Sequence, residues 1–162
     1  METTDLQKKA ESWVQLHFEK RGNNTLVFHN YQQTASTVQS AKDILEAQEM
    51  PLERGEMICL ALWFMYTGYT TNYGHFQAES LNLATSFFKK EKVHPAKQEA
   101  ILHLMHFRDT EETQWEAEEH IMNDAITAYV GTKQFAALSE LLREEINTNI
   151  QKNHSQIGRA HV

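Results

Sequence analysis

The residues best suited to chemistry lie in three short stretches of the chain, each rich in imidazole, amide, phenol or carboxylate groups. The stretches read LVFHNYQQTASTV, LALWFMYTGYTTNYGHFQAES and IMNDAITAYVG. Imidazole and carboxylate groups can hold a divalent cation or transfer a proton. We therefore predict a pocket formed by eight residues, namely His29, Asn30, Gln33, Met65, Tyr66, His75, Glu79 and Asp124.

In their order and spacing, the three stretches resemble successive blocks of the HD-domain superfamily. The closest resemblance is to the bacterial-type subgroup of predicted metal-dependent HD phosphohydrolases, over roughly residues 11–145. There the blocks read F/Y-H-N-x-x-H-T, then A-x-F/W-F-H-D-T-G-Y followed by G-H-E-x-x-S, and finally D-A-D-L-x-x-L-G. The resemblance implies a helical domain whose histidine, His-Asp pair and distant aspartate hold a cation. Such a cation activates water for phosphoester hydrolysis.

The chain departs from these blocks at the metal ligands. The first histidine is Gln33 here, the His-Asp pair is Met65-Tyr66, and the second aspartate of D-A-D is Ile126, which leaves Asp124 as the matching aspartate. An amide, a thioether and a phenol do not supply the donors that Mg²⁺ or Mn²⁺ prefers. The resemblance therefore implies a degenerate HD-domain protein, a pseudoenzyme that lacks the metal site and any cofactor and keeps a binding or regulatory role.

An active phosphohydrolase is the alternative. The resemblance matches His29 to a histidine that protonates the leaving oxygen in related enzymes, and His75 to one that can approach phosphate or a second metal. A site rebuilt from His29, His75 and Asp124, with His103 or His106, could then use Mn, Fe or Mg. A third possibility is a helical bundle that binds no ligand.

Each candidate also has a plain structural interpretation. Asn30 is a strong N-cap residue, and Met65 and Tyr66 can fill core space. Tyr66 could donate a hydrogen bond to a buried Asp124, whose burial would otherwise be costly. His75 and Glu79 would share a helix face if the helix begins by Gly74. The interpretation favoured for His103 and His106 is a pair of surface histidines.

Composition excludes several function classes. The formal net charge of -7 over 162 residues opposes binding to nucleic acid or an anionic membrane. The longest apolar run, residues 57–66, is half the roughly 20 residues that span a bilayer. Cys59 is the only cysteine, and the polar N-terminus has no secretory signal pattern, so we expect a cytoplasmic protein. The expected partners are a small phosphorylated ligand, a partner protein or a second copy in a homodimer.

Apolar periodicity predicts an all-α fold, a compact single-domain bundle of about seven helices. The expected helices cover residues 6–20, 31–48, the segment after Pro51, 76–90, 95–105, 116–129 and 132 to about 151. The segment after Pro51 is apolar on all sides, which places it at the centre of the bundle. We expect the domain to cover residues 1–150, a frayed polar tail to cover 151–162, and the acidic stretch 109–119 to be a solvated loop.

Overall fold

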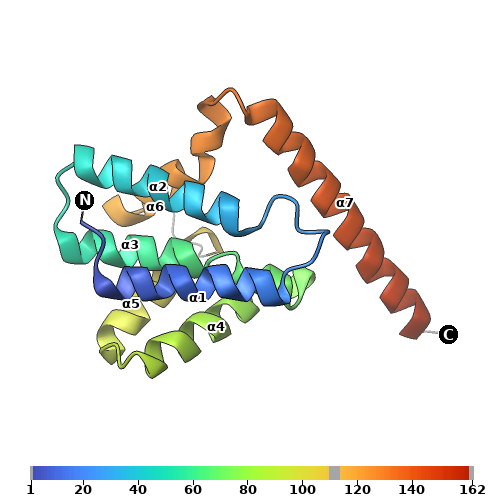
Figure 1. Cartoon of the computed structure of the whole chain (residues 1–162), viewed down its shortest axis with the longest axis horizontal. Helices are drawn as coiled ribbons and strands as arrows, with labels where there is room; N and C mark the ends of the chain where they lie inside the picture. The colour runs from blue at the N-terminus through green and yellow to red at the C-terminus, as the bar shows by residue number, and fades with distance from the viewer. Residues whose placement is uncertain (1, 110–113, 161–162) are drawn as a thin grey trace.

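The chain folds into a bundle of α-helices in a computed structural model that describes residues 2–109 and 114–160, with side chains at 2–108 and 114–150. Within these residues there are seven α-helices and no strands, which confirms the predicted fold class (Figure 1). None of these helices is both long and apolar enough to cross a lipid bilayer. The helices are α1 (Asp5–Arg21), α2 (Tyr31–Ala47), α3 (Leu52–Phe64), α4 (Phe76–Lys90), α5 (Pro95–Met105), α6 (Ala117–Thr127) and α7 (Phe135–Ala160).

Helix α3 forms the centre of the bundle. It contacts α1, α2, α4, α5 and α6, and every residue from Ile58 to Phe64 is buried. This arrangement confirms that the helix with apolar residues on all sides is the central one. Cys59 is buried in this helix, and burial raises the pKa of its thiol to about 11, so the group stays protonated and inert.

Helix starts follow from the capping residues in the sequence. The Thr4 side chain accepts a hydrogen bond from the Gln7 amide at 3.2 Å, which caps α1. Pro51 immediately precedes α3, and Pro95 is the first residue of α5, where its missing N–H costs nothing. Glu116 and Glu119 form a capping box at the start of α6. Part of the acidic stretch, residues 110–113, lies outside the described residues.

A tight turn follows α3 and brings the second candidate stretch against α4. Two 3₁₀ turns, η1 (Thr67–Thr70) and η2 (Tyr73–His75), connect the two helices. The Ser80 hydroxyl accepts a hydrogen bond from the Gly68 amide at 2.8 Å and donates one to the Met65 carbonyl at 3.0 Å. This clamp fixes the backbone on both sides of Met65 and Tyr66, just beyond the end of α3.

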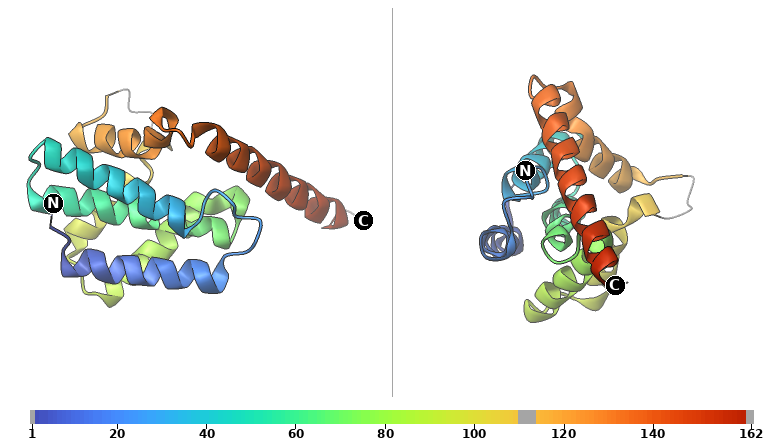
Figure 2. Two further views of the ribbon diagram at one scale, coloured as in Figure 1. Left: turned by 45° about the horizontal axis from the view of Figure 1, so that its top comes forward. Right: turned by 90° about the vertical axis from the view of Figure 1, so that its right-hand side faces the viewer.

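Helix α7 extends away from the body of the bundle (Figures 1 and 2). It contacts η2, another 3₁₀ turn, η4 (Ala128–Gly131), and the turn before α2. Its backbone is helical to Ala160, beyond the expected end near Gln151, so the segment predicted to be a frayed tail is mostly helical. The side chains of 151–160 and residues 161–162 lie outside the described part.

Candidate functional site

Three of the eight predicted residues line one cavity of about 160 Å³, namely His29, Met65 and Tyr66. The cavity lies where the turn before α2, the α3–η1 junction, the start of α4, the end of α5 and helix α6 meet. The remaining lining residues are Tyr69, Phe76, Gln77, Met105, His106, Phe107, Arg108 and Ile126. The fold therefore assembles all three sequence stretches around a small, mainly aromatic and apolar hollow.

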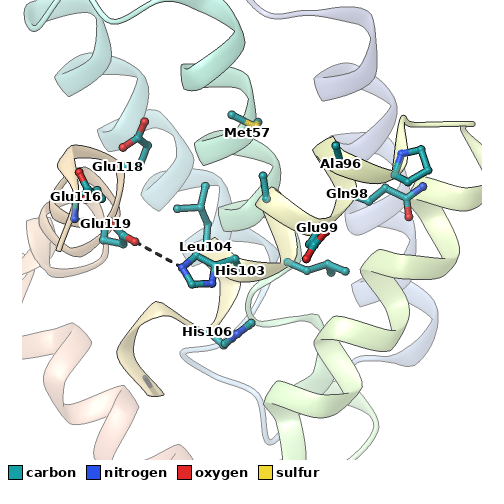
Figure 3. Close-up of a pocket in the computed structure, with 13 residues that line it drawn as sticks. Met57, Ala96, Gln98, Glu99, His103, Leu104, His106, Glu116, Glu118 and Glu119 are labelled. Atoms are coloured by element: carbon teal, nitrogen blue, oxygen red, sulfur yellow. Dashed lines mark hydrogen bonds and ion pairs between the residues drawn. The ribbon is translucent and has the colours of Figure 1, made fainter. Parts of the chain in front are cut away.

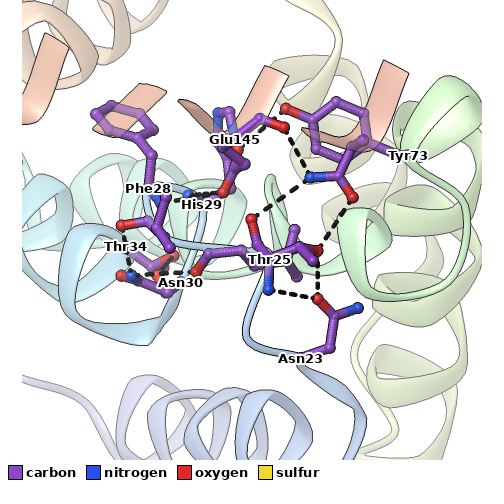
Figure 4. Close-up of polar contacts among 11 residues, drawn as sticks. Asn23, Thr25, Phe28, His29, Asn30, Thr34, Tyr73 and Glu145 are labelled. Carbon is purple, nitrogen blue, oxygen red and sulfur yellow. Dashed lines mark hydrogen bonds and ion pairs between the residues drawn. The ribbon is translucent and has the colours of Figure 1, made fainter. Parts of the chain in front are cut away.

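His29 is held in this cavity by Glu145, a fully buried residue of α7 (Figure 4). The Glu145 carboxylate accepts hydrogen bonds from the backbone amides of Phe28 at 3.0 Å and His29 at 2.8 Å. It also pairs with His29 Nδ1 and accepts a hydrogen bond from the Tyr73 hydroxyl at 3.0 Å. Four donors thus satisfy one buried carboxylate, as burial of such a group requires.

These contacts also determine the protonation of Glu145. Burial acts to raise the pKa of Glu145, but the hydrogen bonds and charge of His29 together with the two backbone amides outweigh it, so the pKa is lowered. The carboxylate is therefore ionised at neutral pH. Because Nδ1 of His29 is engaged by Glu145, only Nε2 of the ring is available to a molecule in the cavity.

Tyr66 contributes a neutral phenol to the cavity wall. Burial raises its pKa to about 12, although nearby Arg108 acts in the opposite direction. Its ring packs edge-on against His29 with the ring centroids 4.8 Å apart. A phenol with this pKa stays protonated at neutral pH, so it can donate a hydrogen bond but cannot act as a base.

The prediction that Tyr66 bonds to a buried Asp124 is wrong, because Asp124 is exposed on α6. Ile126, two residues later, is the α6 residue that lines the cavity. A helix turns by about 100° per residue, so residues two apart point in nearly opposite directions. Of the two aspartate positions in the D-A-D block, the one that faces His29 is therefore occupied by isoleucine.

Asn30 and Gln33 lie outside the lining of the His29 cavity. The Asn30 side chain accepts a hydrogen bond from the Gln33 amide at 3.0 Å and so caps α2, which is the structural interpretation of this residue. Gln33 lines a separate hollow of about 240 Å³ together with Thr37 and Tyr129.

His75 and Glu79 also lie outside the cavity lining. Helix α4 begins at Phe76, as predicted, and not by Gly74 as a shared face with Glu79 would require, so His75 is the exposed residue before the helix. Glu79 is half-buried in the first turn of α4. The cavity therefore does not combine the three residues of the rebuilt site, since His75 and Asp124 are both exposed and absent from its walls.

A larger groove, of about 890 Å³, lies along α5 and the start of α6 (Figure 3). It contains His103, which is exposed, with Nε2 3.9 Å from a carboxylate oxygen of Glu119. His106 borders both the groove and the His29 cavity, and its Nδ1 atom is buried without a hydrogen-bond partner. Across the described residues, no three His, Cys, Asp or Glu side chains gather in a way that could hold a metal.

Sequence reasoning missed Glu145 and most of the aromatic wall. Glu145 sits in the acidic run LREEIN, which looks like a solvated helix face. One signal was available, because Leu138, Leu142, Glu145 and Asn149 follow each other at spacings of four, three and four residues. This spacing indicates the face of a helix that packs against the body. Tyr69 matches the T-G-Y of the second block but was not among the predicted pocket residues, and the rings of Phe76 and Phe107 matched no motif residue.

Comparisons of the chain with protein-family models, curated proteins and solved structures find no match.

Proposed function

We propose that this protein is a degenerate, catalytically inactive relative of the HD-domain phosphohydrolases that binds a small molecule in the His29 cavity, in a binding or regulatory role. The supporting observation is the identity of the side chains at the positions where the resemblance implies metal ligands. Two of those positions, Met65 and Tyr66, line the cavity with a thioether and a phenol, and Ile126, the second aspartate position of the D-A-D block, adds an aliphatic chain. None is a donor suited to a hard divalent cation.

The chemistry of the remaining wall supports the same proposal. The lining includes no carboxylate, and Glu145 behind His29 is fully occupied by its four donors. Activation of water at neutral pH needs a cation, or a base with an adjusted pKa, next to the reacting phosphorus. Tyr66 is a protonated phenol, so it does not fill the second role.

The test combines metal content with activity. Protein purified without chelators should contain no stoichiometric Mn, Fe, Ni or Zn by elemental analysis. A panel of phosphomonoesters, phosphodiesters and nucleotides, with each of these metals and Mg²⁺ added, should give no turnover above background. Metal-dependent turnover that disappears in His29→Ala and persists in the exposed control His120→Ala would overturn the proposal and favour the active phosphohydrolase.

A protein partner and a homodimer stay predictions. Helix α7 exposes apolar side chains at Phe135, Ile146 and Ile150, which are 42%, 37% and 44% accessible. These residues define an apolar face, but nothing on the described surface identifies what covers it.

A further inference from the structure

The His29 cavity differs in charge from the rest of this acidic protein. The chain has 22 aspartate and glutamate residues, yet none of the eleven residues that line the cavity is acidic. Three of them carry basic or imidazole nitrogens, namely His29, His106 and Arg108. A ligand with a negative charge would therefore meet no carboxylate in the wall, whereas a cationic ligand would meet the Arg108 guanidinium.

The walls are flat rings packed against one another. Tyr69 stacks on Phe76 with centroids 3.9 Å apart and an interplanar angle of 8°. His29 also stacks on Tyr69, with 4.0 Å between the two ring centroids and an interplanar angle of 15°. The cavity volume of about 160 Å³ is close to the roughly 150 Å³ of an engineered cavity that holds one benzene molecule. The space therefore suits one ring rather than a base, sugar and phosphate together.

The cavity lining also includes polar groups that could anchor an anion. The exposed Arg108 guanidinium donates to the neutral Asn123 amide oxygen at 2.6 Å and lies over the Phe107 ring at 5.7 Å. The protonated Tyr66 hydroxyl is a further donor in the wall. An anionic oxygen would gain charge-assisted hydrogen bonds here.

We propose that the His29 cavity binds a small aromatic carboxylate, with its ring enclosed by Met65, Tyr66 and Ile126 beside the stacked rings of the wall, and the carboxylate directed toward Arg108. This inference rests on the proposed binding function and specifies its ligand class. Benzoate and phenylacetate are the simplest members of the class. Inorganic phosphate lacks the ring, benzyl alcohol lacks the charge, and benzylamine carries the opposite charge.

The test is calorimetric titration of the full chain with these five compounds, with ¹⁵N chemical-shift mapping to locate the site. We expect benzoate or phenylacetate to bind at least about tenfold more tightly than benzyl alcohol, which is the contribution of a charge-assisted hydrogen bond. Benzylamine and inorganic phosphate should show no saturable binding. Shift changes should include the amides of residues 65–69 and 105–108.

Arg108→Gln provides the variant test. It should weaken benzoate binding by about tenfold or more and leave benzyl alcohol binding unchanged, because only the carboxylate uses the charge. The control is Arg143→Gln, an exposed α7 position paired with Glu140, which should change neither affinity. Arg108 is exposed, so the substitution leaves the core intact.

Several results would overturn the ligand class. They are equal affinity for benzoate and benzyl alcohol, tighter binding of benzylamine, phosphate binding as tight as benzoate, or no saturable binding by benzoate or phenylacetate. The proposed function is tested separately. If the protein hydrolyses no phosphoester but also binds no probe, this inference alone fails, whereas metal-dependent hydrolysis removes the proposed function as well.

Discussion

At the scale of single residues, the most consequential group is the Glu145 carboxylate. It is fully buried and joins α7 to two segments that are distant in sequence, one at Phe28 and His29 and the other at Tyr73. Loss of one partner of a buried, hydrogen-bonded pair is costly because the other group keeps its desolvation penalty. Glu145 therefore links the cavity, through His29, to helix α7.

Glu145→Gln keeps the size of the side chain but removes its charge. It also replaces one carboxylate oxygen, which accepts hydrogen bonds, with an NH₂ group, which donates them. We expect the free energy of unfolding to fall by about 3 kcal/mol. Amide hydrogen exchange in α7 should also speed up more than exchange in α3. The control is Glu144→Gln at the exposed neighbouring position, which should stay within about 0.5 kcal/mol of wild type. Equal effects of the two variants would contradict the role assigned to Glu145.

The same carboxylate predicts an acid-sensitive contribution to stability. Its pKa in the folded protein is below the ordinary glutamate value of 4.5, so its stabilising contribution is complete above that value and is lost as pH falls through the folded pKa. Urea unfolding of wild type and Glu145→Gln should be compared from about pH 7 to about pH 3. The difference between their free energies of unfolding should shrink only below about pH 4.5. A difference that stays constant across this range would contradict the prediction.

At the scale of elements, the junction between η1 and α4 determines the shape of the cavity. Gly68 lies at the point of closest approach, where a Cβ atom would come within 1.9 Å of the Phe76 carbonyl oxygen and 2.6 Å of the Ser80 amide nitrogen. Both are backbone atoms, which cannot rotate away. The glycine is needed for this close approach and not for its backbone angles, because no glycine among the described residues has a positive φ.

Gly68→Ala should therefore destabilise the protein by about 3 kcal/mol, at the upper end of overpacking effects, and displace Tyr66 and Tyr69. The matched control is Gly131→Ala, since a Cβ atom there would meet nothing within 4 Å. That control should change the unfolding free energy by less than about 0.5 kcal/mol. Thermal and urea unfolding of both variants measure the effect, and similar stability of the two would show that η1 can move away from α4.

At the scale of the whole molecule, the three sequence stretches form one cavity because α3 is central and the other helices surround it. A metal site rebuilt at the positions that match the metal ligands of the HD-domain blocks would need donors from α2, from the α3–η1 junction and from α6. The orientation of α6 decides which of the two aspartate positions in the D-A-D block could supply a ligand, which the motif alone does not. The aspartate must occupy position 126, since Asp124 faces solvent.

The four substitutions Gln33→His, Met65→His, Tyr66→Asp and Ile126→Asp should create binding of Mn²⁺ or Zn²⁺ in a folded protein. The triple variant that keeps Ile126 should bind at least about tenfold more weakly, because it lacks the inward carboxylate. Adding Asp124→Asn to the fourfold variant should change nothing. Calorimetry measures binding and circular dichroism checks the fold. A folded fourfold variant that binds no metal would contradict the resemblance.

Much of the fold was predictable because it depends on local patterns. The apolar run before Tyr66 indicated a central helix, Asn30 and Pro95 marked helix starts, and the three-and-four spacing gave the helix faces. The length of α7 was misjudged, because its polar composition gives no periodic apolar signal beyond Gln151. Propensity and capping act over a few residues, so they identify helices better than they identify what each helix contacts.

The sequence alone identified His29, Met65 and Tyr66 as candidate pocket residues, because the order of the three stretches is visible without coordinates. Only the tertiary structure decided which other residues join them. It turned Ile126 inward and Asp124 outward, and it brought Glu145 to His29 across 116 residues of chain. The reason is physical: motif spacing records neighbours along the chain, whereas the direction of a helical side chain depends on the packing of the entire helix.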